Sequence, residues 1–247
     1  MGEIVFKKPK CLLEDVPYTF CPGCTHGIVH NLVGACIDEL GVQGDTIMVT
    51  SVGCGGMNWA FWDTDTIYSM HGRAPANATG IKRMKPDKFV FTYQGDGDLA
   101  SIGVAEIIHS AARGENITVF FINNAIYGMT GGQMAPTTLI GQKTTTAPYG
   151  RDQKLAGMPL AMVEMLATVE GASYIERVSV CSVKHIRQAK TSIKKALTKQ
   201  IDSKGFSLIE IISTCPTNWK MTPAASMEWA NHAMIKRFPL GITKEAE

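Results

Sequence analysis

Two short apolar runs, each followed by polar residues, most constrain what this chain can fold into. Residues 89–93 are closed by the triplet Gly95-Asp96-Gly97, and residues 117–122 are closed by Asn123-Asn124. A segment of helical length, residues 98–113, lies between them. This order predicts two buried strands joined by a crossover helix, with polar side chains at the carboxyl end of each strand. Open α/β sheets bind ligands at that edge.

The residue types at this edge indicate a metal and a phosphorylated ligand. The carboxylate of Asp96 and the amide oxygen of Asn124 are hard oxygen donors of the kind that Mg²⁺ prefers. Gly95 and Gly97 let the backbone approach a diphosphate at the start of a helix, where amide groups favour anions. Gly-Asp-Gly alone is a common turn. The helix, the second strand and the Asn pair make the pattern specific. The alternative is an ordinary turn followed by an Asn-rich turn.

Composition places the chain among globular α/β proteins. It has 247 residues, 45% of them hydrophobic and 19% charged, which fits a single domain over residues 1–247. The net charge of +2 shows no nucleic-acid footprint, and no apolar run approaches the length of a membrane span. Residues 1–10 are polar and basic, which predicts no signal peptide and a cytoplasmic location. We expect an N-terminal segment, residues 1–25, and a C-terminal extension, residues 214–247.

Hydrophobic periodicity predicts strands alternating with helices, and therefore a mostly parallel sheet covered by helices. Helices are expected at residues 26–40, 98–113, 157–168 and 183–200, and strands at residues 47–52, 89–93, 117–122, 173–178 and 206–212. Residues 128–149 are rich in Gly, Thr and Pro and have no clear period. A connection of that length is usually functional or disordered.

Four of the seven cysteines stand where they can converge. Cys21 and Cys24 form a short metal-type pair, while Cys54 and Cys215 each follow a predicted strand. Two chemistries fit four thiolates: a structural Zn²⁺ or a [4Fe–4S] cluster. Zinc sites usually use two short pairs, so one pair with two distant cysteines favours the cluster. The other three, Cys11, Cys36 and Cys181, are expected to be free thiols.

Several motifs in order identify a resemblance. The strings Tyr93-Gln-Gly-Asp-Gly-Asp98 and Asn123-Asn-Ala-Ile-Tyr-Gly-Met-Thr-Gly-Gly-Gln133 resemble the β subunit of 2-oxoacid:ferredoxin oxidoreductases. Shorter strings also match: Cys21-Pro-Gly-Cys24 with His26-Gly27, His71-Gly-Arg-Ala74 and Cys215-Pro-Thr-Asn218. The resemblance spans residues 8–219. One departure is Thr25, where the family usually has Gly.

The resemblance implies a thiamine diphosphate-binding fold, specifically the half that binds the diphosphate, and it implies roles for individual residues. Asp96, Asn124 and the carbonyl of Ile126 would hold Mg²⁺. The four convergent cysteines would hold a [4Fe–4S] cluster. The expected cofactor-binding residues are Gly53, Cys54, Gly55, Gly95, Gly97, Asp98, Gly128 and Met129.

The same resemblance implies the activity and the partners. The family carries out coenzyme A-linked oxidative decarboxylation of a 2-oxoacid and passes the electrons through the cluster to ferredoxin. Thiamine diphosphate serves as the electron sink that lets CO₂ leave. An α subunit with the pyrimidine-binding domain and a small ferredoxin-like subunit are expected. The alternatives are a non-redox thiamine diphosphate decarboxylase or carboligase half with structural zinc, and a non-catalytic metal-binding scaffold.

Three further residues carry expectations about the substrate. His71 and Arg73 are candidate catalytic groups that would donate hydrogen bonds to the diphosphate or to the substrate carboxylate, or they simply cap a helix. Met57 occupies the position, three residues after Cys54, where family members that use 2-oxoglutarate often have a cation. An apolar side chain there favours an aliphatic 2-oxoacid such as 2-oxoisovalerate, with 2-oxoglutarate as the alternative.

Overall fold

The fold is built on one seven-stranded sheet. The computed structural model describes residues 7–246, so the first six residues of the N-terminal segment lie outside it. The strands are β1 (Thr46–Thr50), β2 (Asp65–Tyr68), β3 (Phe89–Gly95), β4 (Thr118–Asn123), β5 (Ala172–Ser179), β6 (Phe206–Ile212) and β7 (Gly241–Glu245). Their order is β2-β1-β3-β4-β6-β5-β7, and only β7 runs antiparallel to its neighbour. The prediction of a mostly parallel sheet is confirmed.

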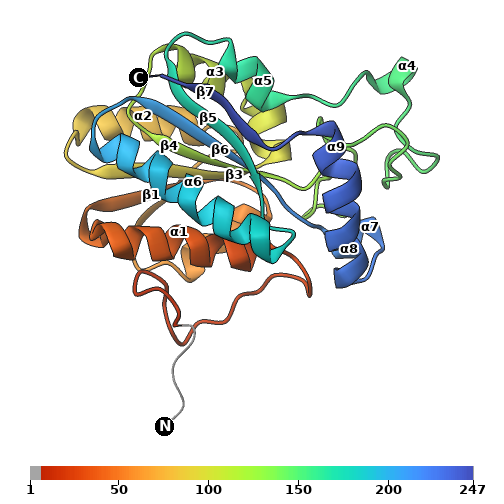
Figure 1. Cartoon of the computed structure of the whole chain (residues 1–247), viewed down its shortest axis with the longest axis horizontal. Coiled ribbons are helices and arrows are strands. Elements are labelled where there is room, and N and C mark those ends of the chain that lie inside the picture. The colour runs from red at the N-terminus through yellow and green to blue at the C-terminus, as the bar shows by residue number, and fades with distance from the viewer. Residues whose placement is uncertain (1–6, 247) are drawn as a thin grey trace.

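Helices occupy both faces of this sheet and one of its ends (Figure 1). The α-helices are α1 (His26–Leu40), α2 (Ala74–Met84), α3 (Val104–Ala112), α4 (Gln153–Ala156), α5 (Met162–Ala167), α6 (Val183–Ile201), α7 (Pro216–Trp219), α8 (Pro223–Trp229) and α9 (Ile235–Arg237). Short turns of 3₁₀-helix form η1 (Gln43–Asp45) and η2 (Cys54–Ala60), and π-helical turns form η3 (Asp98–Ile102) and η4 (Ala230–Met234). None of the described helices is long and apolar enough to span a membrane.

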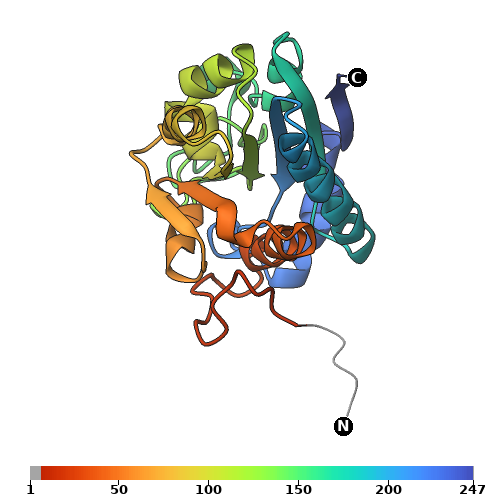
Figure 2. The same cartoon turned by 90° about the vertical axis from the view of Figure 1, so that its left-hand side faces the viewer.

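The central strands β3, β4 and β6 are buried on both faces of the sheet. Their successive side chains therefore enter two apolar clusters, one on each face. On one face α1 and α6 pack through Val33 and Ile193 against Phe91 and Phe120. On the other face α2, α3 and α5 complete a second cluster around Phe121. Figure 2 shows the helices on the two sides of the strands. The result is a helix–sheet–helix sandwich whose strand ends stay available for a site.

Two predicted helices differ from the structure at their first turns. The segment 98–113 starts as the π-turn η3 and becomes α3 only at Val104. The segment 157–168 becomes helical only at Met162, because Gly157 has a left-handed φ of 65° and Pro159 cannot donate a backbone hydrogen bond.

The two edge strands were not predicted from the sequence. The four residues of β2 are mostly exposed, and β7 is equally exposed on the far edge. Edge strands of this kind lack the apolar run that reveals buried strands. The helix α2 also escaped detection, although Pro75 stands in its first turn, where proline is favoured.

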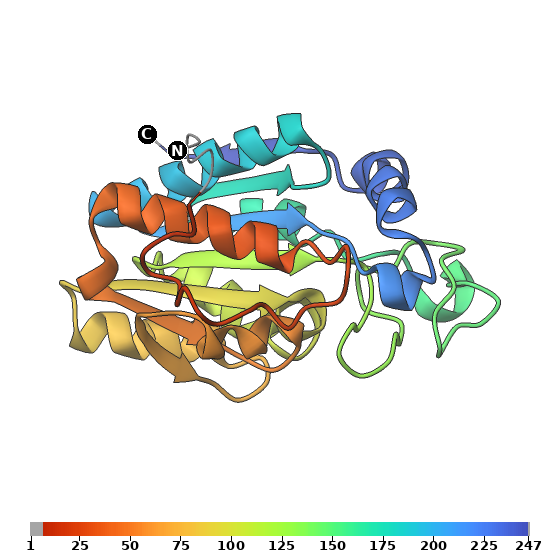
Figure 3. The ribbon, with the colours of Figure 1, turned by 90° about the horizontal axis from the view of Figure 1, so that it is seen from below.

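The C-terminal residues form a compact cap instead of a plain extension. The helices α7, α8 and α9 place Trp219, Met234 and Phe238 in an apolar cluster with Ile126 and Ile212. In Figure 3 these helices (blue) and the long loop (green) lie together beyond one end of the sheet. That end is the carboxyl end of β4 and β6, so the cap lies beside the predicted site.

The long loop between β4 and α5 is ordered by a single buried arginine. Arg151 is only 6% exposed, and its guanidinium donates to six backbone carbonyls. The acceptors are the carbonyls of Ala135, Pro136, Thr138, Ala156, Gly157 and Met158. One planar cation therefore replaces the secondary structure that this Gly-, Thr- and Pro-rich segment lacks.

Replacing Arg151 should loosen this loop without unfolding the sheet. Arg151→Met leaves six carbonyls without their donor, and we expect faster hydrogen–deuterium exchange over residues 128–160 and a loss of at least about 2 kcal/mol in unfolding free energy. Arg151→Lys keeps the charge but has fewer donors, so its loss should be intermediate. Arg187→Met, at an exposed position on α6, is the control. Equal exchange in both Met variants would contradict this role.

Candidate functional site

A pocket opens at the carboxyl end of the parallel strands. Its lining comes from five separate parts of the chain: the start of α1, the turn after β1, the turn between β2 and α2, the end of β3 and the turn after β4. The lining residues are His26, Val52, Gly53, Cys54, Gly55, His71, Gly95, Asp96, Gly97, Asn124, Ile126, Tyr127, Gly128, Met129 and Thr130. The structure therefore brings together most of the residues that the sequence predicted as a site.

Asp96 is the buried acidic group of this pocket. The residue is 3% exposed, and its carboxylate accepts hydrogen bonds from the hydroxyl of Thr137 (2.6 Å) and from the backbone N–H of Gly97 (2.9 Å). Among the described residues it has no ion-pair partner. Burial raises the pKa of Asp96 to about 7, although these hydrogen bonds oppose the rise. A bound cation would supply the missing compensation.

A tight turn after β4 presents two further oxygens beside Asp96. Ala125 has a left-handed φ of 56°, and the turn is held because the Asn123 and Asn124 amide oxygens accept from the backbone N–H groups two residues on (3.1 and 3.2 Å). Asp96, Asn124 and Ile126 thus line one pocket, and their binding of Mg²⁺ stays a prediction.

The orientation of this turn depends on a buried ion pair below the pocket. The Asn123 amide nitrogen donates to Glu210 on β6 (2.7 Å), and the Arg177 guanidinium on β5 donates to the second oxygen of Glu210 (2.9 Å). Arg177 also bonds to Glu164 on α5 (2.7 and 2.8 Å). Burial raises the pKa of Glu210 while Arg177 opposes that rise. The pair therefore fixes which way the Asn123 amide points.

The four predicted cysteines meet on one side of the pocket. The sulfurs of Cys54 and Cys215 lie 3.4 and 3.6 Å from the position of a Cβ on Gly128. Burial raises the pKa of the Cys24 thiol to about 12, with smaller contributions from the other three cysteines. Burial likewise raises the pKa of Cys54 to about 11. Thiols of this kind become thiolates only when a metal binds them.

The spacing of these thiols bears on which metal they suit. A tetrahedral Zn²⁺ with bonds of about 2.3 Å brings its sulfurs to about 3.8 Å from one another. Across residues 7–246, no group of three or more His, Cys, Asp or Glu side chains is arranged to hold a metal ion. No three of the four cysteines therefore stand in a compact single-ion arrangement in the described structure.

Thr25 joins the N-terminal cysteine pair to the fourth cysteine. Its hydroxyl lies 2.6 Å from that of Ser213 and accepts from the backbone N–H of Thr214 (3.1 Å), directly before Cys215. The hydroxyl of Thr214 donates to the carbonyl of Gly23 (2.7 Å). The departure from the family pattern at position 25 is thus a contact that holds two distant segments together.

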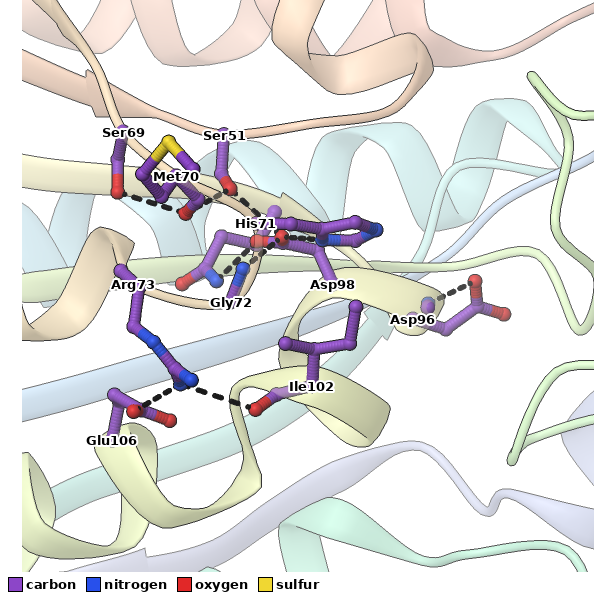
Figure 4. Close-up of polar contacts among 12 residues, drawn as sticks. Ser51, Ser69, Met70, His71, Gly72, Arg73, Asp96, Asp98, Ile102 and Glu106 are labelled. Atoms are coloured by element: carbon purple, nitrogen blue, oxygen red, sulfur yellow. Dashed lines mark hydrogen bonds and ion pairs between the residues drawn. The ribbon is translucent and has the colours of Figure 1, made fainter.

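His71 faces the pocket, and Asp98 holds it from behind (Figure 4). The Nδ1 atom of His71 pairs with the Asp98 carboxylate, which also accepts from the hydroxyl of Ser51 (2.8 Å) and the N–H of Gly72 (2.6 Å). Bonding at Nδ1 leaves Nε2 of His71 for a ligand. Asp98 does not line the pocket, contrary to its expected contact with the diphosphate.

Two other predicted residues point elsewhere. The Arg73 side chain pairs with Glu106 and donates to the carbonyl of Ile102 (3.4 Å), away from the pocket lining (Figure 4). Met57 lies on η2 with 39% of its surface exposed and does not line the pocket either. Neither residue is positioned by this chain to contact a ligand in the pocket.

Comparison with known proteins decides the family. The family model for the C-terminal TPP-binding domain of thiamine pyrophosphate enzymes matches residues 51–211. A subunit of 2-oxoglutarate synthase, KorB, from Methanocaldococcus jannaschii is 44% identical over 83% of this chain and 72% of its own length. The chain belongs to the thiamine pyrophosphate-binding subunits of the 2-oxoacid:ferredoxin oxidoreductases. The resemblance proposed from the motifs is confirmed.

Other members of this family extend the comparison. The ketoisovalerate oxidoreductase subunit VorA from Methanothermobacter thermautotrophicus is 48% identical over 90% of this chain but only 46% of its own length. The chain thus spans about half the length of such relatives. A 2-oxoglutarate:ferredoxin oxidoreductase from Magnetococcus marinus has a similar structure, with a TM-score of 0.79 and 29% identity over 98% of this chain and 86% of the other. The fold class is thereby confirmed.

Two residues at the candidate site, His26 and Thr137, were not predicted from the sequence. His26 lines the pocket, and its Nδ1 lies 2.8 Å from the hydroxyl of Tyr93. Burial lowers the pKa of His26 to about 4, so the ring is neutral at neutral pH. His26 lies two residues after the predicted ligand Cys24, and this closeness in sequence could have indicated it. Nothing near Thr137 in sequence indicates its bond to Asp96, which lies 41 positions earlier.

The raised pKa of Asp96 predicts a pH dependence of stability in the chain without bound metal. The folded state keeps its proton up to about pH 7, whereas the unfolded state loses it near pH 3.8. Unfolding free energy should therefore fall as the pH rises from 5 to 7, by about 2 kcal/mol. Asp96→Asn should remove this fall in chemical denaturation, while Asp152→Asn, at an exposed position, should keep it. The same pH profile in both variants would contradict the assignment.

The two glycines of the triplet should differ in their tolerance of a side chain. A Cβ on Gly97 would lie 1.8 Å from the Tyr127 ring, whereas a Cβ on Gly95 meets nothing within 4 Å. Gly97→Ala should displace Tyr127 and cost about 1–3 kcal/mol in thermal unfolding of the cofactor-free chain. Gly95→Ala should unfold like the wild type. Equal stability of the two variants would show that Tyr127 does not pack against Gly97.

Proposed function

We propose that this chain is the thiamine diphosphate-binding part of a 2-oxoacid:ferredoxin oxidoreductase that decarboxylates a 2-oxoacid and forms its coenzyme A ester. The observation that carries the proposal is that Asp96, Asn124, Ile126 and Cys54 line one pocket, with the sulfur of Cys215 beside Gly128 in its wall. A decarboxylase without redox chemistry needs the oxygen donors but not the cysteines. The relatives of this chain that are named as oxidoreductase or synthase subunits support the same function.

The oxygen donors fit a Mg²⁺ ion that carries a diphosphate. One carboxylate, one amide oxygen and one backbone carbonyl leave room for phosphate oxygens, as Mg²⁺ sites in enzymes usually do. The buried Asp96 carboxylate has hydrogen-bond donors but no cation among the described residues, which is the electrostatic deficit that a metal fills. Gly95, Gly97, Gly128 and Met129 would lie along the diphosphate, with Gly53, Cys54 and Gly55 towards the ring end of the cofactor.

The thiols fit a [4Fe–4S] cluster better than a single ion. Cys21, Cys24, Cys54 and Cys215 supply the four ligands that such clusters take. The side-chain amide of Asn218 also donates to the sulfur of Cys215 (3.3 Å), a contact that suits a charged thiolate. We assign the remaining cysteines no ligand role, since Cys11, Cys36 and Cys181 are buried in the apolar clusters.

The protein's own contribution to the reaction is positioning. Thiamine diphosphate supplies the electron sink for loss of CO₂, and the cluster supplies a one-electron outlet. His71, held by Asp98 through Nδ1, presents Nε2 to the pocket and is our candidate to hold the substrate carboxylate or to move a proton there. The neutral His26 ring, fixed by Tyr93, adds a second hydrogen-bonding group.

We favour an aliphatic substrate such as 2-oxoisovalerate over 2-oxoglutarate. No lysine or arginine is among the described residues that line the pocket, while Val52, Ile126 and Met129 give it apolar surface. The second carboxylate of 2-oxoglutarate would find no cation there. The relatives named ketoisovalerate oxidoreductase subunits, at 48% identity, agree with this preference. Met57, which lies outside the lining, no longer supports it.

The proposed partners are those that the resemblance to the family implies. We propose an α subunit with the pyrimidine-binding domain, a small ferredoxin-like subunit and ferredoxin as the electron acceptor. We treat residues 1–247 as one domain within that assembly. All seven cysteines lie within residues 7–246, and none of them forms a disulfide. Because disulfides are rare in cytosolic proteins, we place the assembly in the cytoplasm.

An anaerobic absorption spectrum tests this proposal. The chain is co-expressed with its partner subunits, loaded with thiamine diphosphate and Mg²⁺, and given 2-oxoisovalerate with coenzyme A. We expect iron and sulfide, a brown chromophore, and bleaching on substrate addition. Cys215→Ser should lose the cluster of this chain, whereas Cys181→Ser, at a buried cysteine bonded to the Ile212 carbonyl, should keep it.

The outcomes separate the alternatives. A colourless protein that contains zinc would leave the non-redox decarboxylase or carboligase. Bleaching with 2-oxoglutarate alone would overturn the substrate preference and keep the enzyme class. Purified complex that binds no thiamine diphosphate would leave only a metal-binding scaffold.

A further inference from the structure

Asn218 bridges the cysteine group and the loop that lines the cofactor pocket. Its amide nitrogen donates to the backbone carbonyl of Gly128 (2.8 Å) and to the sulfur of Cys215 (3.3 Å). A side-chain amide nitrogen carries two hydrogens, so both bonds form at the same time. Gly128 lies against the sulfurs of Cys54 and Cys215 and lines the pocket.

The surroundings of Asn218 hold it in this position. A Cβ on Gly132 would lie 3.0 Å from the Asn218 amide oxygen, so the loop packs closely on its far side. The next residue, Trp219, donates its ring N–H to the carbonyl of Asn124 (3.1 Å) and packs on Trp229 with ring centres 4.5 Å apart. Helix α7 is therefore anchored at the proposed metal-binding turn, and the amide has little freedom to leave the sulfur.

We propose that Asn218 is a positioning residue that raises the reduction potential of a cluster bound at Cys215. The inference rests on the proposed function, because it requires that cluster. Adding an electron to an iron–sulfur cluster increases the negative charge on its sulfur ligands, and a hydrogen-bond donor stabilises the reduced form more than the oxidised one. The bond to Gly128 keeps this donor in place while the loop carries the cofactor.

A redox titration of the assembled, anaerobically purified enzyme tests the inference. Dithionite supplies one electron per cluster, and the reduced cluster is followed by electron paramagnetic resonance. The signal that disappears in Cys215→Ser identifies this cluster among any carried by partner subunits. In Asn218→Leu we expect the ratio of reduced to oxidised cluster at a fixed potential to fall about tenfold, a midpoint lower by about 59 mV.

Two further variants separate this effect from a general loss of structure. Asn218→Asp keeps the shape but replaces the donor with a negative charge, so its midpoint should fall at least as far. Asn231→Leu removes another side-chain amide of the C-terminal cap, one that donates to the carbonyl of Cys181 (2.8 Å), and should leave the midpoint unchanged. If Asn218→Leu fails to assemble its cluster, Asn218→Asp decides the question.

The failures are distinguishable. A full iron content with an unchanged midpoint in both Asn218 variants would overturn the inference and leave the proposed function intact. A wild-type enzyme without the Cys215-dependent cluster would overturn the proposed function, and the inference with it. A midpoint that falls equally in Asn231→Leu would show a structural effect of the cap instead of a bond to sulfur.

Discussion

The parallel direction of the strands is the constraint on which the site depends. Because β1, β3, β4 and β6 run the same way, their carboxyl ends share one edge. The glycine-rich turn after β1, the triplet at Asp96, the turn at Asn124 and the cysteine after β6 therefore converge, although they are separated by tens of residues in sequence. Reversing any one of these strands would carry its polar residues to the opposite edge.

That shared edge is crowded with buried polar groups, and the rest of the fold supports them. Asp96 accepts hydrogen bonds from Thr137 and Gly97, and Arg177 orients Asn123 through Glu210. Arg151 orders the long loop. The C-terminal cap closes over the same edge through Trp219. The turn at Asn124 and the segment that carries Cys215 are consequently parts of one hydrogen-bonded assembly.

Prediction from sequence succeeded where a local pattern had one structural meaning. The apolar runs before Asp96 and Asn124 specify buried parallel strands, and the order of motifs specified the family. It failed where the partner of a side chain is distant. Asp98 follows the triplet and was expected at the diphosphate, yet it accepts bonds from Ser51 and Gly72. Arg73 pairs with Glu106, which no spacing rule could indicate.

The sequence by itself determined the five inner strands, the edge at which the candidate site lies, and which oxygens and thiols are available there. These follow from hydrophobic period and residue chemistry, which are local properties. Only the tertiary structure decided that Thr25 ties the first two cysteines to the last, that His26 enters the pocket, and that Asn218 reaches both Cys215 and Gly128. Such contacts depend on which distant segments pack together, and that is set by burial of the whole core.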